Sequence, residues 1–345
     1  PRPRIRSVAV RVGLFLAYWP WFSPEEQLEL ARLGDELGLD SVWISEAWGQ
    51  DAVSVLGYLA ASTERIGLGS GLMQIPARPP TATAMAAASL DVISRGRFRL
   101  GLGLSGPQVS EGWYGVPFVK PVTRTREYVD VVRRALAREK VQLECEGGMG
   151  LGRPLRLLAQ PVQERIPIYL GAIGPRAVAQ TGELADGWLP FMFNPAAPEV
   201  LLERLDEGLE RGGRSRGDID VAPVVPVAVE DDLQAARDAV RPWLAFYLGA
   251  MGAKEKNFYV DLAARYGFGE EARACQDLML GGDRDAAADV LSDELVDAGA
   301  IAATPDTLGE RVAAYADAGA DTLVAVPAGN DKPAVVRALA EATSG

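Results

Sequence analysis

The sequence predicts an α/β fold, namely a (β/α)8 TIM barrel with insertions at the carboxyl-terminal rim of its strands. Eight short apolar runs alternate with helical patterns along the 345 residues, and no long linker separates them. Each run is apolar on both faces, which is typical of parallel strands that helices cover on both sides. Barrels of this kind commonly reach this length, so we expect a single domain over residues 1–345. An open doubly wound sheet is the alternative.

The first half of the chain predicts four strand–helix units. The first strand is expected at 8–15, and the helix after it begins at Ser23, an N-cap residue that precedes Pro24. Acidic residues in the first turn and Gly38 after the last turn complete the pattern of a helix. The other strands are expected at 41–45, 66–72 and 97–104, and the other helices at 52–62, 81–94 and 123–138.

The second half repeats this alternation, with two interruptions. Strands are expected at 168–171, 187–190, 221–229 and 322–326, and helices at 175–184, 198–211, 232–248, 307–318 and 332–342. The glycine-rich segment 142–161 and the segment 251–300 do not fit, and we interpret both as insertions over one rim of the barrel. The longer insertion suits either a lid over a pocket or a contact between subunits.

Composition and charge exclude several classes of protein. The net charge of −12 argues against nucleic acid as a partner, because phosphate binding needs a basic face. No apolar run is long enough to span a membrane. The basic residues 1–7, which we expect to be disordered, do not lead into a signal-peptide pattern. We therefore expect a cytoplasmic protein that acts on a small molecule. Cys145 and Cys275 are far apart and are interpreted as packing or surface residues.

The chain contains no histidine. This excludes a histidine general base, a Ser-His-Asp triad and the usual zinc and non-haem iron sites. We therefore expect no metal. An enzyme with these absences is expected to take its reactivity from an organic cofactor.

Candidate site residues follow the predicted strands directly, where barrel enzymes build their sites. The second strand is followed by Glu46, Trp48 and Asp51, and two carboxylates beside an indole suit a proton donor next to a planar ligand. The alternative is that Glu46 pairs with an arginine while Trp48 belongs to the core. The sequence leaves both interpretations open.

Glycines follow the third, fourth and fifth strands. Glycine at a buried strand end suggests a bulge or the close approach of a ligand, as at 69–76. The glycines at 101–106 have the G-x-G-x-x-G spacing of a dinucleotide-binding fingerprint, but no helix start follows them immediately, so we discount that interpretation. Residues 171–174 lead through Pro175 into a helix, whose free N–H groups would suit a phosphate together with Arg176. The alternative for this loop is an ordinary turn.

Taken in order, these segments resemble the luciferase-like family of coenzyme F420-dependent oxidoreductases. The resemblance covers residues 8–195, and only the general layout continues beyond them. The segments that carry it are 11–16, 40–46 (DSVWISE), 63–76 (TERIGLGSGLMQIP), 96–115 (GRFRLGLGLSGPQVSEGWYG), 123–129 (TRTREYV) and 166–190 (IPIYLGAIGPRAVAQTGELADGWLP). The resemblance implies a barrel with the cofactor across the carboxyl ends of its strands, and a homodimer.

The resemblance also implies which residues contact the cofactor. Gly71 and Leu72 would form a backbone bulge, often a cis non-prolyl peptide, that supports the face of the cofactor ring. Glu46 would touch the ring or its polar edge. The other implied contacts are Ser105 and Ser110 at the ring edge or ribityl chain, and the backbone of Gly171, Ala172, Ile173 and Gly174 along the ribityl chain and phosphate.

This chain departs from the family pattern at two positions. Ala47 stands where some members carry an active-site histidine, and Pro107 stands where some sugar-phosphate dehydrogenases carry a catalytic glutamate. Both departures argue against a sugar-phosphate substrate. Hydride transfer needs orientation more than acid–base catalysis. If the reaction needs a proton, the candidate donors are, in order, Glu46, Tyr18, Tyr114 and Glu111.

An aromatic pocket is predicted over the cofactor ring. Its walls would be Tyr18, Trp19, Trp48, Trp113, Phe191 and Phe193, which suggests a bulky, mostly apolar substrate. The alternative is that these aromatic residues are ordinary core.

The favoured function is that of an F420-dependent reductase or dehydrogenase, which moves a hydride between the deazaflavin and an organic substrate. An FMN-dependent luciferase-like monooxygenase is the main alternative. Two further hypotheses are a barrel that binds a flavin without catalysis and a metal-dependent hydrolase, and the absence of histidine argues against the latter.

Overall fold

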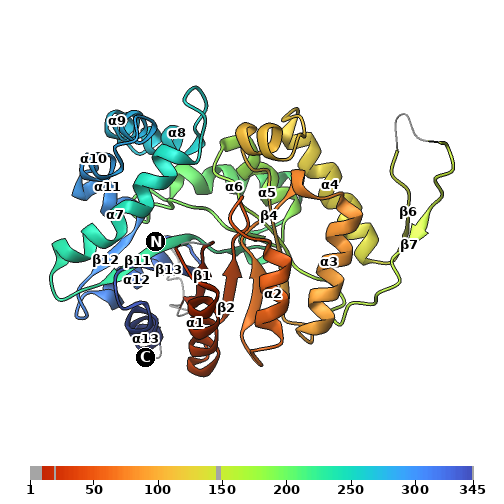
Figure 1. Ribbon diagram of the computed structural model, residues 1–345, viewed down its shortest axis with the longest axis horizontal. Helices are drawn as coiled ribbons and strands as arrows, with labels where there is room; N and C mark the ends of the chain where they lie inside the picture. The colour runs from red at the N-terminus through yellow and green to blue at the C-terminus, as the bar shows by residue number, and fades with distance from the viewer. Residues whose placement is uncertain (1–9, 19–20, 145–148, 344–345) are drawn as a thin grey trace.

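The computed structural model describes residues 10–18, 21–144 and 149–343. Figure 1 shows its strands at the centre, with helices around them. The strands are β1 (Arg11–Leu16), β2 (Ser41–Ile44), β3 (Gly67–Ser70), β4 (Met73–Gln74), β5 (Phe98–Gly103), β6 (Lys140–Val141), β7 (Leu155–Arg156), β8 (Ile168–Leu170), β9 (Gly187–Trp188), β10 (Asp220–Val221), β11 (Val224–Val229), β12 (Ile301–Ala303) and β13 (Thr322–Pro327).

The helices cover the outside of the sheet and one of its ends. They are α1 (Pro24–Leu37), α2 (Ala52–Ala60), α3 (Pro80–Ile93), α4 (Pro121–Leu136), α5 (Pro175–Leu184), α6 (Glu199–Arg211), α7 (Leu233–Ala250), α8 (Phe258–Arg265), α9 (Gly269–Leu280), α10 (Arg284–Asp289), α11 (Asp293–Gly299), α12 (Leu308–Asp317) and α13 (Lys332–Thr343). In the described part of the chain, no helix is both long and apolar enough to cross a membrane.

The parallel strands close into a ring. The order β1-β2-β3-β5-β8-β9-β10 runs around one side, and β11 pairs with β13, which pairs with β1. Only residues 222 and 223 separate β10 from β11, so these two strands act as one member of the ring. The predicted (β/α)8 barrel is therefore confirmed.

The structure adds elements within and between the predicted units. β4 and β12 are short strands that pair with β5 and β11, and their two or three residues are too few to show a strand pattern. The insertion at 142–161 contains β7, which pairs antiparallel with β6 directly before the insertion. The insertion at 251–300 holds α8 to α11. Residues 1–7 and Cys145 lie outside the described residues.

The first helix begins and ends as its sequence predicts. The Ser23 hydroxyl accepts a hydrogen bond from the Glu26 N–H at 3.1 Å, and the Glu26 carboxylate accepts one from the Ser23 N–H at 2.9 Å. This reciprocal pair satisfies N–H groups that a helix leaves free at its amino end. Gly38 ends the helix with a φ of 77°, a backbone conformation that glycine adopts without strain.

An ion network closes the amino-terminal end of the barrel. Arg99 pairs with Asp40 at 2.5 Å, and Arg11 pairs with Asp220 at 2.9 Å. The Asp220 carboxylate also accepts a hydrogen bond from the Tyr169 hydroxyl at 2.7 Å. Since these residues lie at the beginnings of strands, the network is at the opposite end of the barrel from the predicted site.

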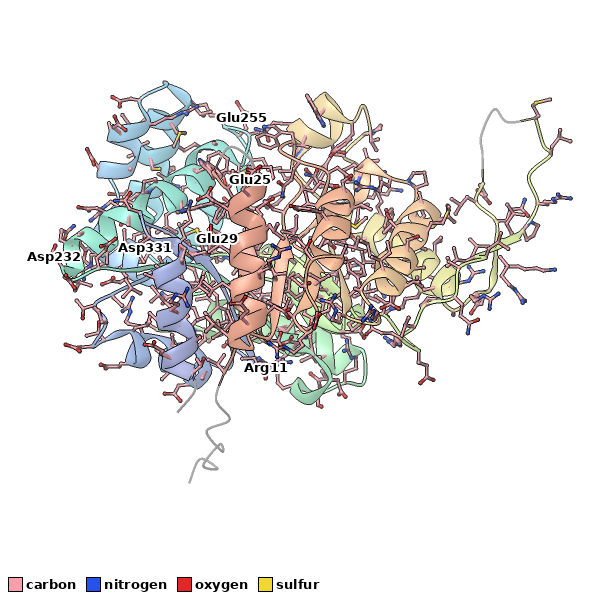
Figure 2. The ribbon with its side chains drawn as sticks, turned by 60° about the horizontal axis from the view of Figure 1, so that its bottom comes forward. Arg11, Glu25, Glu29, Asp232, Glu255 and Asp331 are labelled. Atoms are coloured by element: carbon pink, nitrogen blue, oxygen red, sulfur yellow. The ribbon has the colours of Figure 1, made fainter. Side chains whose placement is uncertain are left out.

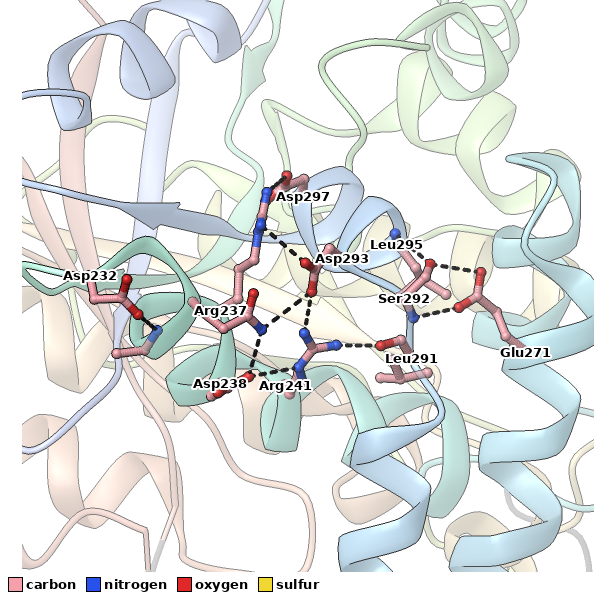
Figure 3. Close-up of polar contacts among 12 residues, drawn as sticks. Asp232, Arg237, Asp238, Arg241, Glu271, Leu291, Ser292, Asp293, Leu295 and Asp297 are labelled. Atoms are coloured by element: carbon pink, nitrogen blue, oxygen red, sulfur yellow. Dashed lines mark hydrogen bonds and ion pairs between the residues drawn. The ribbon is translucent and has the colours of Figure 1, made fainter.

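Arginines of α7 fasten the long insertion to the barrel (Figure 3). Arg237 donates to Asp293 and Asp297, and Arg241 donates to Asp293 and to the carbonyl of Leu291. These contacts join α7 to α11 and to the turn before it, so the insertion forms a packed layer rather than a separate unit.

Candidate active site

The turn after β3 contains a cis peptide bond between Gly71 and Leu72, as the family resemblance implies. The Leu72 side chain points toward glycines of the neighbouring strands. A Cβ atom on Gly103 would lie 2.8 Å from Leu72 Cδ1, and one on Gly171 would lie 2.2 Å from it. A side chain at either position would force the Leu72 side chain to move. The turn therefore sits on a glycine-lined shelf at the carboxyl ends of β5 and β8.

Glu46 lies at the next strand end and is bound by three N–H donors. Its Oε2 atom accepts from the Gln74 N–H and from Arg78 Nη1, both at 2.9 Å, and its Oε1 atom accepts from Arg78 Nη2 at 2.5 Å. Arg78 also reaches Asp51 at 2.7 Å. The carboxylate is only 4% exposed. The alternative of an arginine partner for Glu46 is therefore confirmed, and the role of Glu46 as first proton donor stays a prediction.

Two phenols flank this region and keep their protons. The Tyr18 side chain is buried and points its hydroxyl at the Met251 sulfur, 3.9 Å away. Burial, and then the neighbouring Tyr259, raise the pKa of Tyr18 well above its ordinary value. Tyr114 donates to the carbonyl of Ala47 at 3.3 Å, and its pKa is raised by burial and then by the charge of Glu46. Both can therefore hold a proton near neutral pH.

The turn η2 (Gln108–Trp113), which is π-helical, carries three other predicted residues. The Ser110 hydroxyl donates to the Val116 carbonyl at 2.7 Å and is buried, while Glu111 accepts from the Phe118 N–H at 2.9 Å. Both side chains hold the loop that follows the turn. Trp113 is 66% exposed at the rim. The predicted contacts of these residues with a cofactor or substrate stay predictions.

The aromatic wall is larger than the sequence suggests. Phe191 stacks on Tyr247 with ring centroids 3.8 Å apart, and Tyr259 contacts both rings. Trp21 joins Tyr18 to α7 by contacts with Trp243 and Phe246. The α7 and α8 aromatics were missed because an amphipathic helix pattern does not say what its buried face meets.

Other predicted wall residues have different surroundings. Phe193 is 1% exposed and packs between Trp188 and Tyr315, so it belongs to the core and its assignment to the pocket is wrong. Trp48 is 46% exposed and is not core. Trp19 lies outside the described residues.

The loop from β8 to α5 begins a helix with no side-chain cap. Gly174 is the N-cap residue and Pro175 follows it, so the first N–H groups of α5 lack a capping side chain. Arg265 of α8 reaches this loop, where its Nη2 atom donates to the Ile173 carbonyl at 2.7 Å. Burial lowers the pKa of Arg265. A half-buried guanidinium bound to carbonyls, beside free N–H groups, suits an anion. The exposed Arg176 lies on the first turn.

Two buried polar atoms near Glu46 have no hydrogen-bond partner in the described structure. They are Ser45 Oγ, directly after β2, and Gln74 Oε1, on β4, and both residues are more than 90% buried. An unsatisfied buried polar atom costs about 1–3 kcal/mol. Their position at neighbouring strand ends suits a ligand that presents hydrogen-bonding groups along one edge.

Together these features define a barrel enzyme whose candidate site lies at the carboxyl ends of its strands. The luciferase-like monooxygenase family model matches residues 8–322, and the chain belongs to this family. The prediction of an oxidoreductase is confirmed. A protein of Mycobacterium tuberculosis, named as a coenzyme F420-dependent oxidoreductase, is 42% identical over 94% of this chain and 96% of its own.

Solved structures repeat the same architecture. The coenzyme F420-dependent tetrahydromethanopterin reductase of Methanopyrus kandleri superposes with a TM-score of 0.84 at 27% identity, over 97% of this chain and 98% of its own. The FMN-bound oxygenating constituent of 3,6-diketocamphane monooxygenase of Pseudomonas putida has a TM-score of 0.70 at 19% identity, over 97% and 98%. At that identity the second likeness shows the fold alone.

Proposed function

We propose that this chain is a coenzyme F420-dependent oxidoreductase that transfers a hydride between the deazaflavin and an organic substrate. The observation that carries the proposal is the cis Gly71–Leu72 turn on its glycine-lined shelf, in a barrel that also has unpartnered buried polar atoms on Ser45 and Gln74 and a guanidinium at the loop before α5. The 42% identity to a protein named for coenzyme F420 favours this cofactor over FMN. When bound, the deazaflavin would supply the hydride chemistry.

The chain's own residues would bind and orient the cofactor. The Gly71–Leu72 backbone would support the ring face, and Ser45 and Gln74 would bond its polar edge. Arg265, and the predicted Arg176, would bind the anionic tail at the start of α5. Contacts from Ser105, which has a positive φ of 62°, and from the backbone of 171–174 stay predictions.

A proton, where the reaction needs one, would come from a phenol. Tyr18 and Tyr114 stay protonated because their pKa values are raised, whereas Glu46 is bound by Arg78. Tyr18 belongs to the aromatic wall, so it would face a substrate over the ring. Phenol rings and Phe191 around it favour a bulky, mostly apolar substrate. The homodimer and the cytoplasmic location stay predictions.

Titration of the purified protein with coenzyme F420 and, separately, with FMN tests the cofactor. We expect fluorescence quenching to give micromolar binding of F420 and binding of FMN that is at least ~10-fold weaker. Tight FMN with weak F420 would favour the monooxygenase alternative, and binding of neither would contradict the proposal.

The Gln74→Leu variant tests the proposed hydrogen bond between Gln74 and the cofactor, and is expected to leave the stability of the fold intact. Loss of one hydrogen bond should weaken F420 binding about 10-fold. The melting temperature of the free protein should not fall, because the variant removes an unsatisfied buried oxygen. Gln234→Leu, at an exposed position of α7, is the matched control and should leave F420 binding unchanged.

A further inference from the structure

Three tyrosine side chains gather at the carboxyl-terminal end of the barrel, and we call Tyr18, Tyr247 and Tyr259 the phenol cluster. Tyr18 follows β1 closely, Tyr247 lies in the last turn of α7 and Tyr259 in the first turn of α8. The Tyr18 hydroxyl donates to the Met251 sulfur at 3.9 Å, and Met251 follows Tyr247 by one helical turn. The rings of Tyr247 and Tyr259 have centroids 5.2 Å apart. The three side chains are therefore neighbours, although they come from distant parts of the chain.

The phenol cluster lies on the side of the barrel rim away from the glycine-lined shelf. The shelf is formed after β3 and at the ends of β5 and β8. Phe191, which stacks on Tyr247, follows β9 and pairs with Val224 at the beginning of β11. In the closed ring, β9, β11, β13 and β1 form the other half. The phenol cluster thus occupies the part of the rim that the predicted cofactor contacts leave free.

The hydroxyl groups of the phenol cluster have no strong acceptor. Among the described residues, the hydroxyls of Tyr247 and Tyr259 have no hydrogen-bond partner. The partner of Tyr18 is a thioether sulfur, which is a weak acceptor. Neither Tyr247 nor Tyr259 is among the described residues whose unpartnered polar atom is sealed from solvent, so each oxygen reaches accessible space. Since buried phenols usually find a partner, these hydroxyls are placed for a molecule that enters this space.

The phenol cluster is electrically neutral. Burial raises the pKa of all three phenols, to about 12 for Tyr259, and neighbouring phenols raise the pKa values of Tyr18 and Tyr247 further. No charged side chain of the described residues contributes to these shifts, whereas Glu46 contributes to that of Tyr114. All three hydroxyls therefore keep their protons near neutral pH and can donate hydrogen bonds.

Charged residues of α7, α8 and the loop between them are directed elsewhere. Figure 2 shows Asp232, the N-cap residue of α7, at the outer edge of the molecule and labels Glu255 in the exposed loop before α8. Arg237 of α7 binds Asp293, and Arg265 of α8 reaches the loop before α5. The phenol cluster therefore offers a substrate hydroxyl groups and aromatic rings rather than charge.

We propose that the phenol cluster binds the oxygen of a ketone or aldehyde, so that the reaction of this site interconverts a carbonyl compound and its alcohol. The proposal rests on the proposed function, which supplies the hydride. In the reduction, the carbonyl carbon gains a hydride from the reduced deazaflavin, and the π electrons of the C=O bond move to the oxygen. That oxygen takes a proton from the Tyr18 hydroxyl. The proton that the reduced deazaflavin releases returns to Tyr18 through water.

The carbonyl class follows from the chemistry of the donors. Hydrogen bonds from Tyr247 and Tyr259 become stronger as the carbonyl oxygen gains negative charge, so they stabilise the transition state more than the bound substrate. An imine also accepts a hydride, but its basic nitrogen favours a carboxylate partner, and the phenol cluster contains none. A carbon–carbon double bond offers the hydroxyls no strong acceptor.

Two probes of equal shape test the binding of the oxygen: para-fluoroacetophenone and para-fluoro-α-methylstyrene, in which a CH2 group replaces the oxygen. Fluorine NMR of the protein with oxidised F420 measures both affinities without turnover. The wild type should bind the ketone at least ~10-fold more tightly than the alkene, and Tyr247→Phe and Tyr259→Phe should each weaken ketone binding about 5-fold and leave alkene binding unchanged. Tyr315→Phe, the same change at a buried phenol of α12 in the core, is the matched control and should alter neither affinity.

The same signal follows the reaction, because reduced F420 should convert the ketone to its alcohol and leave the alkene intact. Equal binding of ketone and alkene to the wild type, no binding of either up to about 1 mM, or a ketone that binds without being reduced would each overturn the proposal. An unchanged preference in both Tyr247→Phe and Tyr259→Phe, or its loss in the control, would overturn the assignment to these hydroxyls.

Titration of the same proteins with F420 separates this proposal from the proposed function. The wild type and all three variants should bind F420 equally, which would also show that the variants are folded. Normal F420 binding without a preference for the ketone would contradict the carbonyl site alone. A preference for the ketone without F420 binding would support the contact with the oxygen and overturn the hydride transfer.

Discussion

Arg78 binds two carboxylates at the carboxyl-terminal rim of the barrel. It binds both oxygens of Glu46 and reaches Asp51, and so it joins the end of β2 to the start of α2. Glu46 is buried whereas Asp51 is half exposed. Arg78 is the cation of both ion pairs. If Arg78 were removed, the Glu46 carboxylate would be a buried charge without a partner, whereas the Asp51 carboxylate would still contact water.

Replacing Arg78 by methionine is expected to lower the free energy of unfolding by about 3–5 kcal/mol, because Glu46 would keep a buried, uncompensated charge. Urea unfolding at neutral pH measures the loss. The double variant Arg78→Met, Glu46→Leu should recover most of it. Asp51→Asn is the matched control and should cost less than about 1 kcal/mol. An equal loss for Arg78→Met and Asp51→Asn would contradict this view of the pair.

At the scale of elements, the loop from β8 to α5 serves two purposes over four residues. Its first glycine makes room for Leu72, since a Cβ on Gly171 would lie 2.2 Å from Leu72 Cδ1. Its last glycine opens α5, and a Cβ on Gly174 would come no closer than 3.9 Å to Phe258. Gly171 thus leaves space for the Leu72 side chain at one end of the loop. Gly174 leaves the first N–H groups of α5 without a capping side chain at the other end.

The variants Gly171→Ala and Gly174→Ala separate these purposes. Gly171→Ala should lower the free energy of unfolding by about 1–3 kcal/mol through overpacking against Leu72. Gly174→Ala should change it by less than about 0.5 kcal/mol, as at other positions with room. Thermal or urea unfolding of both proteins gives the comparison. If the two variants were equally stable, the glycine-lined shelf would not be needed for packing.

At the scale of the whole molecule, the two ends of the barrel differ in whether their polar groups have partners. Oppositely charged groups compensate each other at the amino-terminal end, where Arg99 binds Asp40 and Arg11 binds Asp220. At the carboxyl-terminal end, polar atoms of Ser45 and Gln74 are left without partners. The contacts at the amino-terminal end therefore stabilise the fold, whereas the unpartnered polar atoms at the carboxyl-terminal end suit the binding of a ligand.

The ion pair between Arg99 and Asp40 makes the stability of the fold depend on pH in the acid range. Burial raises the pKa of Asp40, but the hydrogen bond and charge of Arg99 outweigh burial and hold the pKa below its ordinary value. A carboxylate with a lowered folded-state pKa adds stability above its unfolded pKa of about 4, and this stability is lost as pH falls through the folded value. Urea unfolding should therefore separate wild type from Asp40→Asn clearly at pH 7, and by much less well below pH 4.

An exposed carboxylate provides the control for this pH dependence. Glu29→Gln on α1 should change stability little at either pH, because the side chain has no close cation in the described structure. A difference between wild type and Asp40→Asn that stays constant from pH 7 to pH 3 would show that the pair acts through packing rather than charge.

The sequence by itself determined the eight strand–helix units and the barrel, and its resemblance to the luciferase-like family implied the cis turn at Gly71–Leu72. The units and the barrel follow from local causes: apolar runs, caps such as Ser23, and glycines at strand ends. Only the tertiary structure decided which side chain pairs with Glu46, because its partner Arg78 is 32 positions away and no local pattern connects them. It also placed Phe193 in the core, stacked Tyr247 on Phe191 and brought Arg265 to the loop before α5. Contacts between distant segments depend on how helices pack around the closed ring, and periodicity along the chain does not contain that information.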